Sequence, residues 1–211
     1  MTAEMLLNAF ATLIVLIDPP GVAAIFLAVT AGFSTAQRKS VAIRASFIAA
    51  IILIVFAVFG KSLLALFGIT LDAFRIAGGI MLFWIAFEMV FEKRQPRREK
   101  QVEEAVHDDH VRDIAVFPLA IPLISGPGSI SAIVLLSGTF NEPYERAALT
   151  GIIAACMLIT LGALLIADRL NAMIPQSTRS LISRLLGLIL AALAVQFVAD
   201  GIRSLVLASS A

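Results

Sequence analysis

The sequence has little of what catalysis, metal binding or disulfide bonding requires. Its 211 residues include one cysteine, Cys156, which lies in an apolar run, so an internal disulfide is excluded. Both histidines, His107 and His110, stand in one polar segment, so no apolar run holds a histidine that could activate a serine. A phosphate-binding Gly-x-x-x-x-Gly-Lys sequence is also absent, which excludes an ATP-driven motor. We therefore expect no enzyme activity, no cofactor and no metal site, and we interpret residues 107–110 as a solvated loop.

A large excess of charge of one sign is lacking as well. The formal net charge of +1 gives no reason to expect a nucleic-acid partner. Apolar residues instead make up 60% of the chain and the mean hydropathy is +0.98, whereas a soluble domain is about half apolar. No lysine or arginine precedes the first apolar run, so we interpret that run as a retained helix and not a cleaved signal peptide. The composition predicts an all-α membrane protein that sits in the lipid bilayer.

Six apolar runs are long enough to cross roughly 30 Å of hydrocarbon as helices. They cover residues 5–31, 41–60, 72–91, 114–138, 146–167 and 182–206. The charged connector, residues 92–113, divides the chain into a first three-helix unit, 1–91, and a second, 114–211.

The basic residues predict the orientation of these six helices. The connector and the loops after the first and fifth helices lie on one side of the predicted membrane and hold 12 of the 16 lysines and arginines. The positive-inside rule places that side in the cytoplasm. Both termini are therefore predicted to be periplasmic in a multi-pass protein of the bacterial inner membrane.

The two three-helix units resemble each other in sequence. "LIDPPG" (16–21) matches "LISGPG" (123–128), and "RIAGGI" (75–80) matches "RLLGLI" (184–189). Because each unit has an odd number of helices, the second copy enters the membrane from the opposite side. The result is an inverted repeat, a layout common among secondary transporters. The identities are few, and chance similarity of two apolar segments is the alternative interpretation.

The matching motifs predict that the first and fourth helices are broken near the membrane midplane. A proline in a helix interior removes a backbone donor, and such a break survives in lipid only where protein or a wet cavity surrounds it. Asp18 is predicted to cap a half-helix that begins at Pro19, and Ser125 to begin the same arrangement from the other side. Two half-helix N-termini facing one cavity favour an anionic group such as a carboxylate. The predicted substrate- or ion-binding residues are Asp18, Pro19, Pro20, Gly21, Ser125, Gly126, Pro127, Gly128 and Ser129.

This binding site has a structural alternative. The breaks would then be proline kinks that only shape packing, with Asp18 as a plain helix cap. Against this, an aspartate in the middle of a membrane helix costs about 3 kcal/mol on insertion scales and is a functional candidate by default.

Three segments of the chain resemble one known family. "IDPPGVAAIFLAVT", "PLAIPLISGPGSISAIVLL" and the charged connector look like the MarC family of bacterial inner-membrane proteins, and the resemblance covers essentially the whole chain. It implies a six-helix integral membrane protein grouped with exporters of the LysE type. Some members are linked to neutral amino-acid transport. The resemblance says more about the fold than about the substrate.

Four further polar residues in or beside the apolar runs are candidates with two interpretations each. Arg75 and Arg184 either reach to the headgroups or act as gates or substrate contacts. Glu88 is either solvated at the interface or part of a proton relay. Gln196, near the centre of the last helix, either bonds a neighbouring helix or lines the substrate cavity.

The leading functional hypothesis is a secondary transporter that exports or exchanges a small polar metabolite such as a neutral amino acid. Ser125 and the N–H groups after Gly126 would bind a carboxylate, and Asp18 would bind an ammonium group or carry a coupling proton. The alternatives are a passive channel and a non-transporting membrane protein that acts in stress or assembly. Assembly into a homo-oligomer is left open by the sequence.

Overall fold

The computed structural model describes residues 2–107, 114–140 and 142–209, and these residues form helices joined by short turns, without a β-strand among them. In chain order the helices are α1 (Ala3–Ile17), α2 (Pro19–Val29), α3 (Thr35–Leu66), α4 (Leu71–Val90), α5 (Arg94–His107), the π-type helix η1 (Ala115–Ile124), α6 (Pro127–Thr139), α7 (Pro143–Leu165), α8 (Ala167–Met173) and α9 (Gln176–Ser209).

Five candidate spans are long and apolar enough to cross a membrane: α1 with α2, then α3, α4, α7 and α9. A sixth is the pair η1 and α6, when its two bent parts are counted as one span. These spans correspond to the six apolar runs of the sequence. The prediction of an all-helical protein with six apolar spans agrees with the structure at this level.

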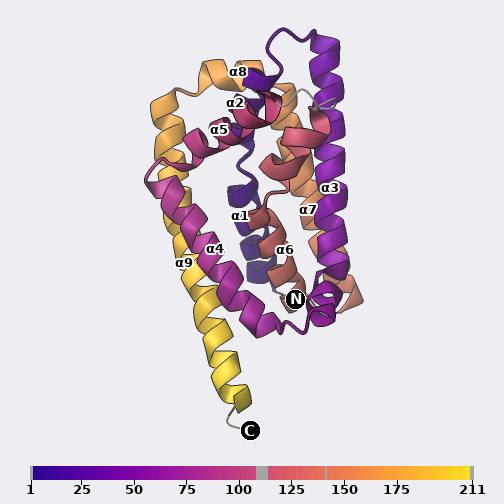
Figure 1. The fold of residues 1–211 in the computed structure, drawn as a ribbon, viewed down its shortest axis with the longest axis vertical. Coiled ribbons are helices and arrows are strands. Elements are labelled where there is room, and N and C mark those ends of the chain that lie inside the picture. The colour runs from indigo at the N-terminus through magenta and orange to yellow at the C-terminus, as the bar shows by residue number, and fades with distance from the viewer. Residues whose placement is uncertain (1, 108–113, 141, 210–211) are drawn as a thin grey trace.

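The spans are arranged as two outer pairs around an inner layer (Figure 1). α4 packs along α9 on one side, and α3 packs along α7 on the other. α1 and α6 lie between the pairs and supply much of the buried core, including Leu13, Leu16, Ile133 and Leu135. The outer helices expose large apolar side chains such as Phe47 and Leu188, as helices that face lipid do.

Glycines allow α4 and α9 to approach closely. A Cβ atom added at Gly79 would lie 2.9 Å from the carbonyl oxygen of Ala194, and one at Gly201 would lie 2.9 Å from that of Asp72. Small residues at such contacts let the backbones of membrane helices meet. The tight pairing fixes the end of α4, from which the chain turns into α5.

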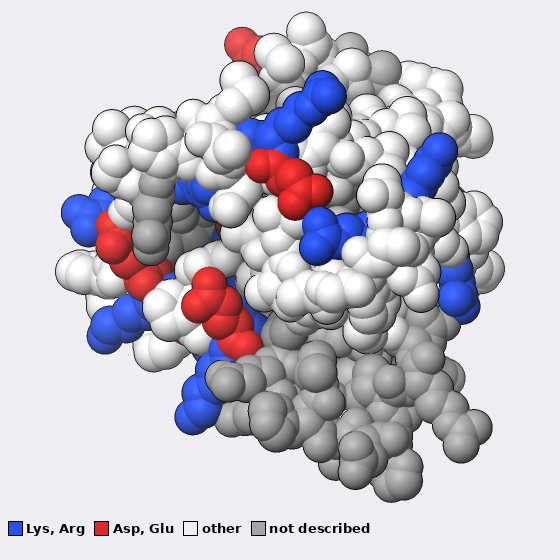
Figure 2. All heavy atoms as spheres, turned by 90° about the horizontal axis from the view of Figure 1, so that it is seen from above, with Lys and Arg blue, Asp and Glu red and all other residues white. Residues whose placement is uncertain are grey.

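The upper end of the molecule in Figure 1 carries α2, α5 and α8. Figure 2 looks down on this end and shows lysine, arginine, aspartate and glutamate side chains gathered there. An ion pair of 3.2 Å between Arg38 and Asp168 joins α3 to α8. α1 begins and α9 ends toward the opposite end of the molecule.

The charged connector is more structured than a simple linker. Its residues Arg94–His107 form α5, which packs against α2, α4 and η1. Residues 108–113, with His110 and most of the predicted solvated loop, lie outside the described residues. The first turns of α5 supply side chains to the candidate site.

Candidate functional site

Asp18 separates α1 from α2 by adopting a left-handed backbone conformation, with φ of 57° and ψ of 66°. Pro19 and Pro20 occupy the first positions of α2, where a missing N–H costs least. One carboxylate oxygen of Asp18 accepts the N–H of Gly21 at 3.2 Å. Asp18 therefore ends one helix and caps the next, and the cap predicted from the sequence is present.

The two prolines leave two carbonyl oxygens of α1 without their usual donors. In a continuous helix the N–H of residue 19 would bond the carbonyl of Val15, and that of residue 20 the carbonyl of Leu16. Proline has no N–H to give. A carbonyl left unpaired in an apolar interior is costly, so the fold has to supply donors from elsewhere.

The second break has a similar origin and a different geometry. η1 contains Pro118 and Pro122, each preceded by a cis peptide bond, and its axis is bent by 57° from that of α6. α6 begins at Pro127, which leaves the carbonyl of Leu123 without its helical donor. Ser125 lies buried at the bend, and its hydroxyl donates to the carbonyl of Ala49 in α3 at 3.3 Å.

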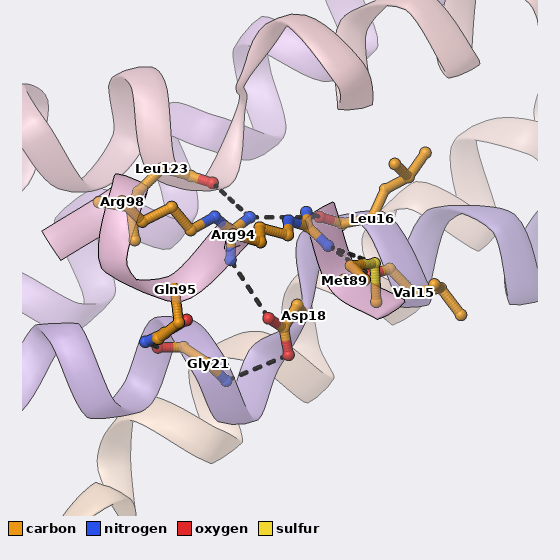
Figure 3. A network of polar contacts seen from close by, with 9 residues as sticks. All are labelled: Val15, Leu16, Asp18, Gly21, Met89, Arg94, Gln95, Arg98 and Leu123. Atoms are coloured by element: carbon orange, nitrogen blue, oxygen red, sulfur yellow. Dashed lines mark hydrogen bonds and ion pairs between the residues drawn. The ribbon is translucent and has the colours of Figure 1, made fainter. Parts of the chain in front are cut away.

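Two arginines of α5 supply donors to all three carbonyls (Figure 3). Arg94 donates to the carbonyl of Val15 at 3.4 Å and, more closely, to that of Leu16. Arg98 donates to Leu16 at 3.4 Å and to Leu123 at 3.5 Å. The side chain of Arg98 therefore links the two proline motifs, which are 107 residues apart in the sequence.

These arginines are buried, and only Arg98 has a charge partner that offsets its burial directly. Arg98 forms an ion pair with the second carboxylate oxygen of Asp18 at 3.3 Å. No carboxylate among the described residues forms an ion pair with Arg94, whose third contact is the sulfur of Met89. Burial and the neighbouring charge of Arg98 lower the pKa of Arg94 to about 9. An anion that bound beside Arg94 would relieve this cost.

Glu88, in the last turns of α4, is held by two partners on one oxygen only. Its Oε1 accepts from the indole N–H of Trp84 at 3.1 Å and pairs with Arg97 at 3.0 Å. Its Oε2 is buried and finds no hydrogen-bond partner among the described residues. Glu88 is almost fully buried, whereas nearly half of the Arg97 side chain is exposed.

A cavity of about 450 Å³ lies between these groups. It is lined by residues of α1, α4, α5, η1 and α6: Leu16, Ile80, Met81, Trp84, Ile85, Arg94, Arg97, Arg98, Pro122, Leu123, Gly126, Pro127, Gly128 and Ser129. Most of the lining is apolar, and the charged groups among these residues are three guanidinium groups of α5. A pocket of this size with a few converging polar groups is typical of a small-molecule site.

The N-terminus of α6 opens into this cavity without a cap. Gly126 stands at the N-cap position and no side chain bonds the first turn. The first N–H bonded within the helix is that of Ile130, at 3.0 Å from the carbonyl of Gly126, so the N–H groups of Gly128 and Ser129 precede it. Free N–H groups and the positive end of the helix dipole favour an anion there.

The structure places the predicted site residues in three different surroundings. Gly126, Pro127, Gly128 and Ser129 line the cavity. Asp18, Pro19 and Pro20 form the first break beside it, where the Gly21 carbonyl accepts from the amide of Gln95 at 3.2 Å. Ser125 faces α3 instead.

The remaining candidates are paired away from the cavity. Gln196 is exposed on α9 and donates to Asp200 at 2.9 Å. Arg75 pairs with Asp72 at 2.8 Å within α4. Arg184 pairs with Glu92 at 2.6 Å.

Four residues at the cavity were not predicted as functional from the sequence: Arg94, Arg97, Arg98 and Trp84. The three arginines were counted only as cytoplasmic charge. Two signals were available in the sequence. The spacing 94, 97 and 98 places three guanidinium groups on one face of a helix, and the prolines at 19, 20 and 127 demand outside donors for three carbonyls.

Comparison with known proteins identifies the family. The model described as "MarC family integral membrane protein" matches residues 3–206. The chain belongs to the MarC family. It is 33% identical to the UPF0056 membrane protein MJ1677 of Methanocaldococcus jannaschii, over 98% of this chain and 100% of the relative.

Two bacterial relatives match over similar lengths. The UPF0056 membrane protein YvbG of Bacillus subtilis is 33% identical over 97% of each chain. The UPF0056 membrane protein YhcE of Escherichia coli is 34% identical over 93% of this chain and 91% of its own. No solved structure matches the chain. The family resemblance drawn from the sequence is therefore confirmed, and these names describe membrane proteins without naming a substrate.

Proposed function

We propose that this MarC family protein is a secondary transporter, not an enzyme, that exports or exchanges a small carboxylate-bearing solute. A neutral amino acid is the first candidate. The observation that supports this proposal is the cavity of about 450 Å³, which combines three arginines with the uncapped N-terminus of α6. The carboxylate would lie between the guanidinium groups of Arg94 and Arg97 and the N–H groups of Gly128 and Ser129.

The proposal includes the inverted repeat and a site near the membrane midplane. α1 has 15 residues and α6 has 13. At 1.5 Å per residue, the two breaks lie about 22 and about 20 Å from the same end of the bundle. This similar depth favours two breaks that serve one site, with the charged end cytoplasmic and both termini periplasmic.

The position of α5 suggests how access is controlled. Its arginines bond the carbonyls of both breaks, and the helix packs against α2, α4 and η1 at the charged end. In the proposed cycle α5 closes the cytoplasmic route to the cavity, and its displacement opens that route. Alternating access around a fixed central site is the general scheme for transporters of this kind.

Uptake into proteoliposomes tests the proposal. Purified protein is reconstituted with alanine inside and radiolabelled alanine is added outside. We expect saturable exchange in the wild type and its loss in Met81→Trp, because Met81 lines the cavity and a larger side chain there fills it. Phe83→Trp is the matched control, because Phe83 lies two residues along the same helix, is exposed and is not among the lining residues. Flux that rises linearly with alanine and never saturates would instead indicate a passive channel.

A further inference from the structure

The contacts of Glu88 identify a carboxylate that is held from one side only. Its Oε1 has two donors, Trp84 and Arg97, while its buried Oε2 has none among the described residues. A buried carboxylate oxygen without a donor costs free energy. Both partners of Oε1 line the cavity, so a solute in the cavity meets the two side chains that hold Glu88 in place.

Arg97 is the partner that can leave. Nearly half of its side chain is exposed, whereas Glu88 is almost fully buried in α4. A carboxylate entering the cavity is a stronger partner for a guanidinium than water is. If Arg97 turns to that carboxylate, Glu88 keeps its charge in an apolar setting with only the Trp84 indole as a donor. A buried carboxylate in that position needs a positive charge or a proton.

The charged groups around Glu88 set the balance. Arg97 contacts Glu88, and the charges of Arg94 and Arg98 lie near enough to interact with it. Asp18 pairs with Arg98, and Arg184 of α9 pairs with Glu92. Around the cavity and the first break, three guanidinium groups therefore accompany two carboxylates. One added anion with one added proton leaves the net charge of this group unchanged. An added zwitterion leaves it unchanged without a proton.

We infer that Glu88 and Arg97 form an exchangeable ion pair that couples solute binding to uptake of a positive charge. The carboxylate of the solute takes the Arg97 guanidinium. Glu88 then takes the positive charge that travels with the solute, which is the ammonium group of an amino acid or, for a simple monocarboxylate, a proton. The inference rests on the proposed function only in placing the solute in this cavity.

The same contacts make Asp18 unsuited to that role. Its two oxygens are both occupied, one by the Gly21 N–H and the other by Arg98. Arg98 is itself buried and bonded to carbonyls of both breaks, so its side chain leaves Asp18 only when α5 moves as a whole. The sequence-based hypothesis of coupling through Asp18 is therefore replaced by coupling through Glu88.

Binding in detergent tests the inference without any transport. The chain has one tryptophan, Trp84, so its fluorescence reports directly on this site. Lactate and alanine serve as probes, because both carry a carboxylate and only alanine carries an ammonium group. Between about pH 5.5 and about pH 7.5 the carboxylates of lactate and alanine stay ionised and the ammonium group of alanine keeps its proton. We expect lactate affinity to fall about tenfold per pH unit as pH rises, since one proton binds with it, and alanine affinity to stay constant.

Glu88→Gln gives opposite results for the two probes. The neutral amide imitates protonated Glu88, so lactate should bind tightly at every pH, while alanine should bind at least tenfold more weakly because its ammonium group loses its partner. Glu92→Gln is the matched control, since Glu92 lies just after α4 and pairs with Arg184 instead. It should leave both affinities and both pH profiles unchanged.

The outcomes separate this inference from the proposed function. The predicted pH profiles without exchange in proteoliposomes would support the inference and contradict the transport proposal. Lactate binding that is independent of pH in the wild type would overturn the inference even if exchange is observed, and so would failure of either probe to change the Trp84 signal. If Glu88→Gln does not fold, the wild-type profiles alone decide. If Glu88 had only a structural role, Glu88→Gln would weaken the binding of lactate and of alanine alike, which would also overturn the inference.

Discussion

The two breaks of this protein arise from the same residue type and are stabilised in different ways. At the first, the Asp18 carboxylate accepts from the N–H of Gly21 and from Arg98, so the break carries its own acceptor and takes a donor from α5. At the second, no side chain caps α6, and the N–H groups of its first turn lead into the cavity. In our proposal the first break has a structural role and anchors α5, and the second is the one that binds a ligand.

The largest effect is expected from removing the arginine that joins the two breaks. Arg98→Met leaves the Asp18 carboxylate unpaired and takes a donor from the carbonyls of Leu16 and Leu123. Loss of one partner of a buried ion pair costs about 3–5 kcal/mol, so we expect little monodisperse protein in detergent. Adding Asp18→Asn to this variant should recover part of the stability, because the unpaired Asp18 carboxylate is then removed. Arg97→Met should lower the unfolding temperature less, because the Arg97 side chain is nearly half exposed, although buried Glu88 then keeps only the Trp84 indole as a donor. Equal losses of stability in Arg97→Met and Arg98→Met would contradict the proposal that Arg98 has a structural role and Arg97 contacts the ligand.

The next effect concerns the backbone of the second break. A Cβ atom at Gly126 would lie 2.6 Å from the carbonyl oxygen of Pro122, and backbone cannot give way as a side chain can. Gly126→Ala should therefore lower the free energy of unfolding by about 1–3 kcal/mol, the usual cost of overpacking.

Gly151→Ala in α7 is the control, since nothing lies within 4 Å of its Cβ position. It should stabilise the protein by about 0.5–1 kcal/mol. Thermal unfolding in detergent measures both, and a stabilised Gly126→Ala would show that the bend relaxes freely.

The smallest effects separate capping from charge at the two aligned positions. Asp18→Asn and Asp18→Ala both lose the ion pair with Arg98, and only the asparagine keeps a good helix cap. The alanine variant should therefore be less stable than the asparagine variant by about 1 kcal/mol. Ser125→Ala loses only the hydroxyl bond to Ala49 and should cost about 1 kcal/mol. Stability curves in denaturant are sufficient to resolve these differences. Identical stabilities of Asp18→Asn and Asp18→Ala would mean that the cap to Gly21 contributes nothing.

The sequence was a good guide to the spans, and its proline motifs lie where α1 meets α2 and where η1 meets α6. Long apolar runs and the Asp-Pro-Pro-Gly and Gly-Pro-Gly motifs are local signals, and local chemistry such as the Asp18 cap follows from them directly. The contribution of α5 could not be found in the same way. The contacts of Arg98 with Asp18 and Leu123 span 80 and 25 residues and depend on how α4 returns the chain to the breaks. The position of Gln196 away from the cavity likewise depends on the rotation of α9 against α4.

Protection of a cysteine at the second break tests the central claim most directly. The only native cysteine, Cys156, is buried and does not line the cavity, so Ser129→Cys introduces a single thiol in the cavity lining. Labelling by a negatively charged thiosulfonate is followed in the presence of alanine or of alanine methyl ester, which lacks the carboxylate. The account predicts that alanine slows labelling and that the methyl ester does not. Equal protection by both compounds, or protection by neither, would contradict a carboxylate site between the arginines of α5 and the N-terminus of α6.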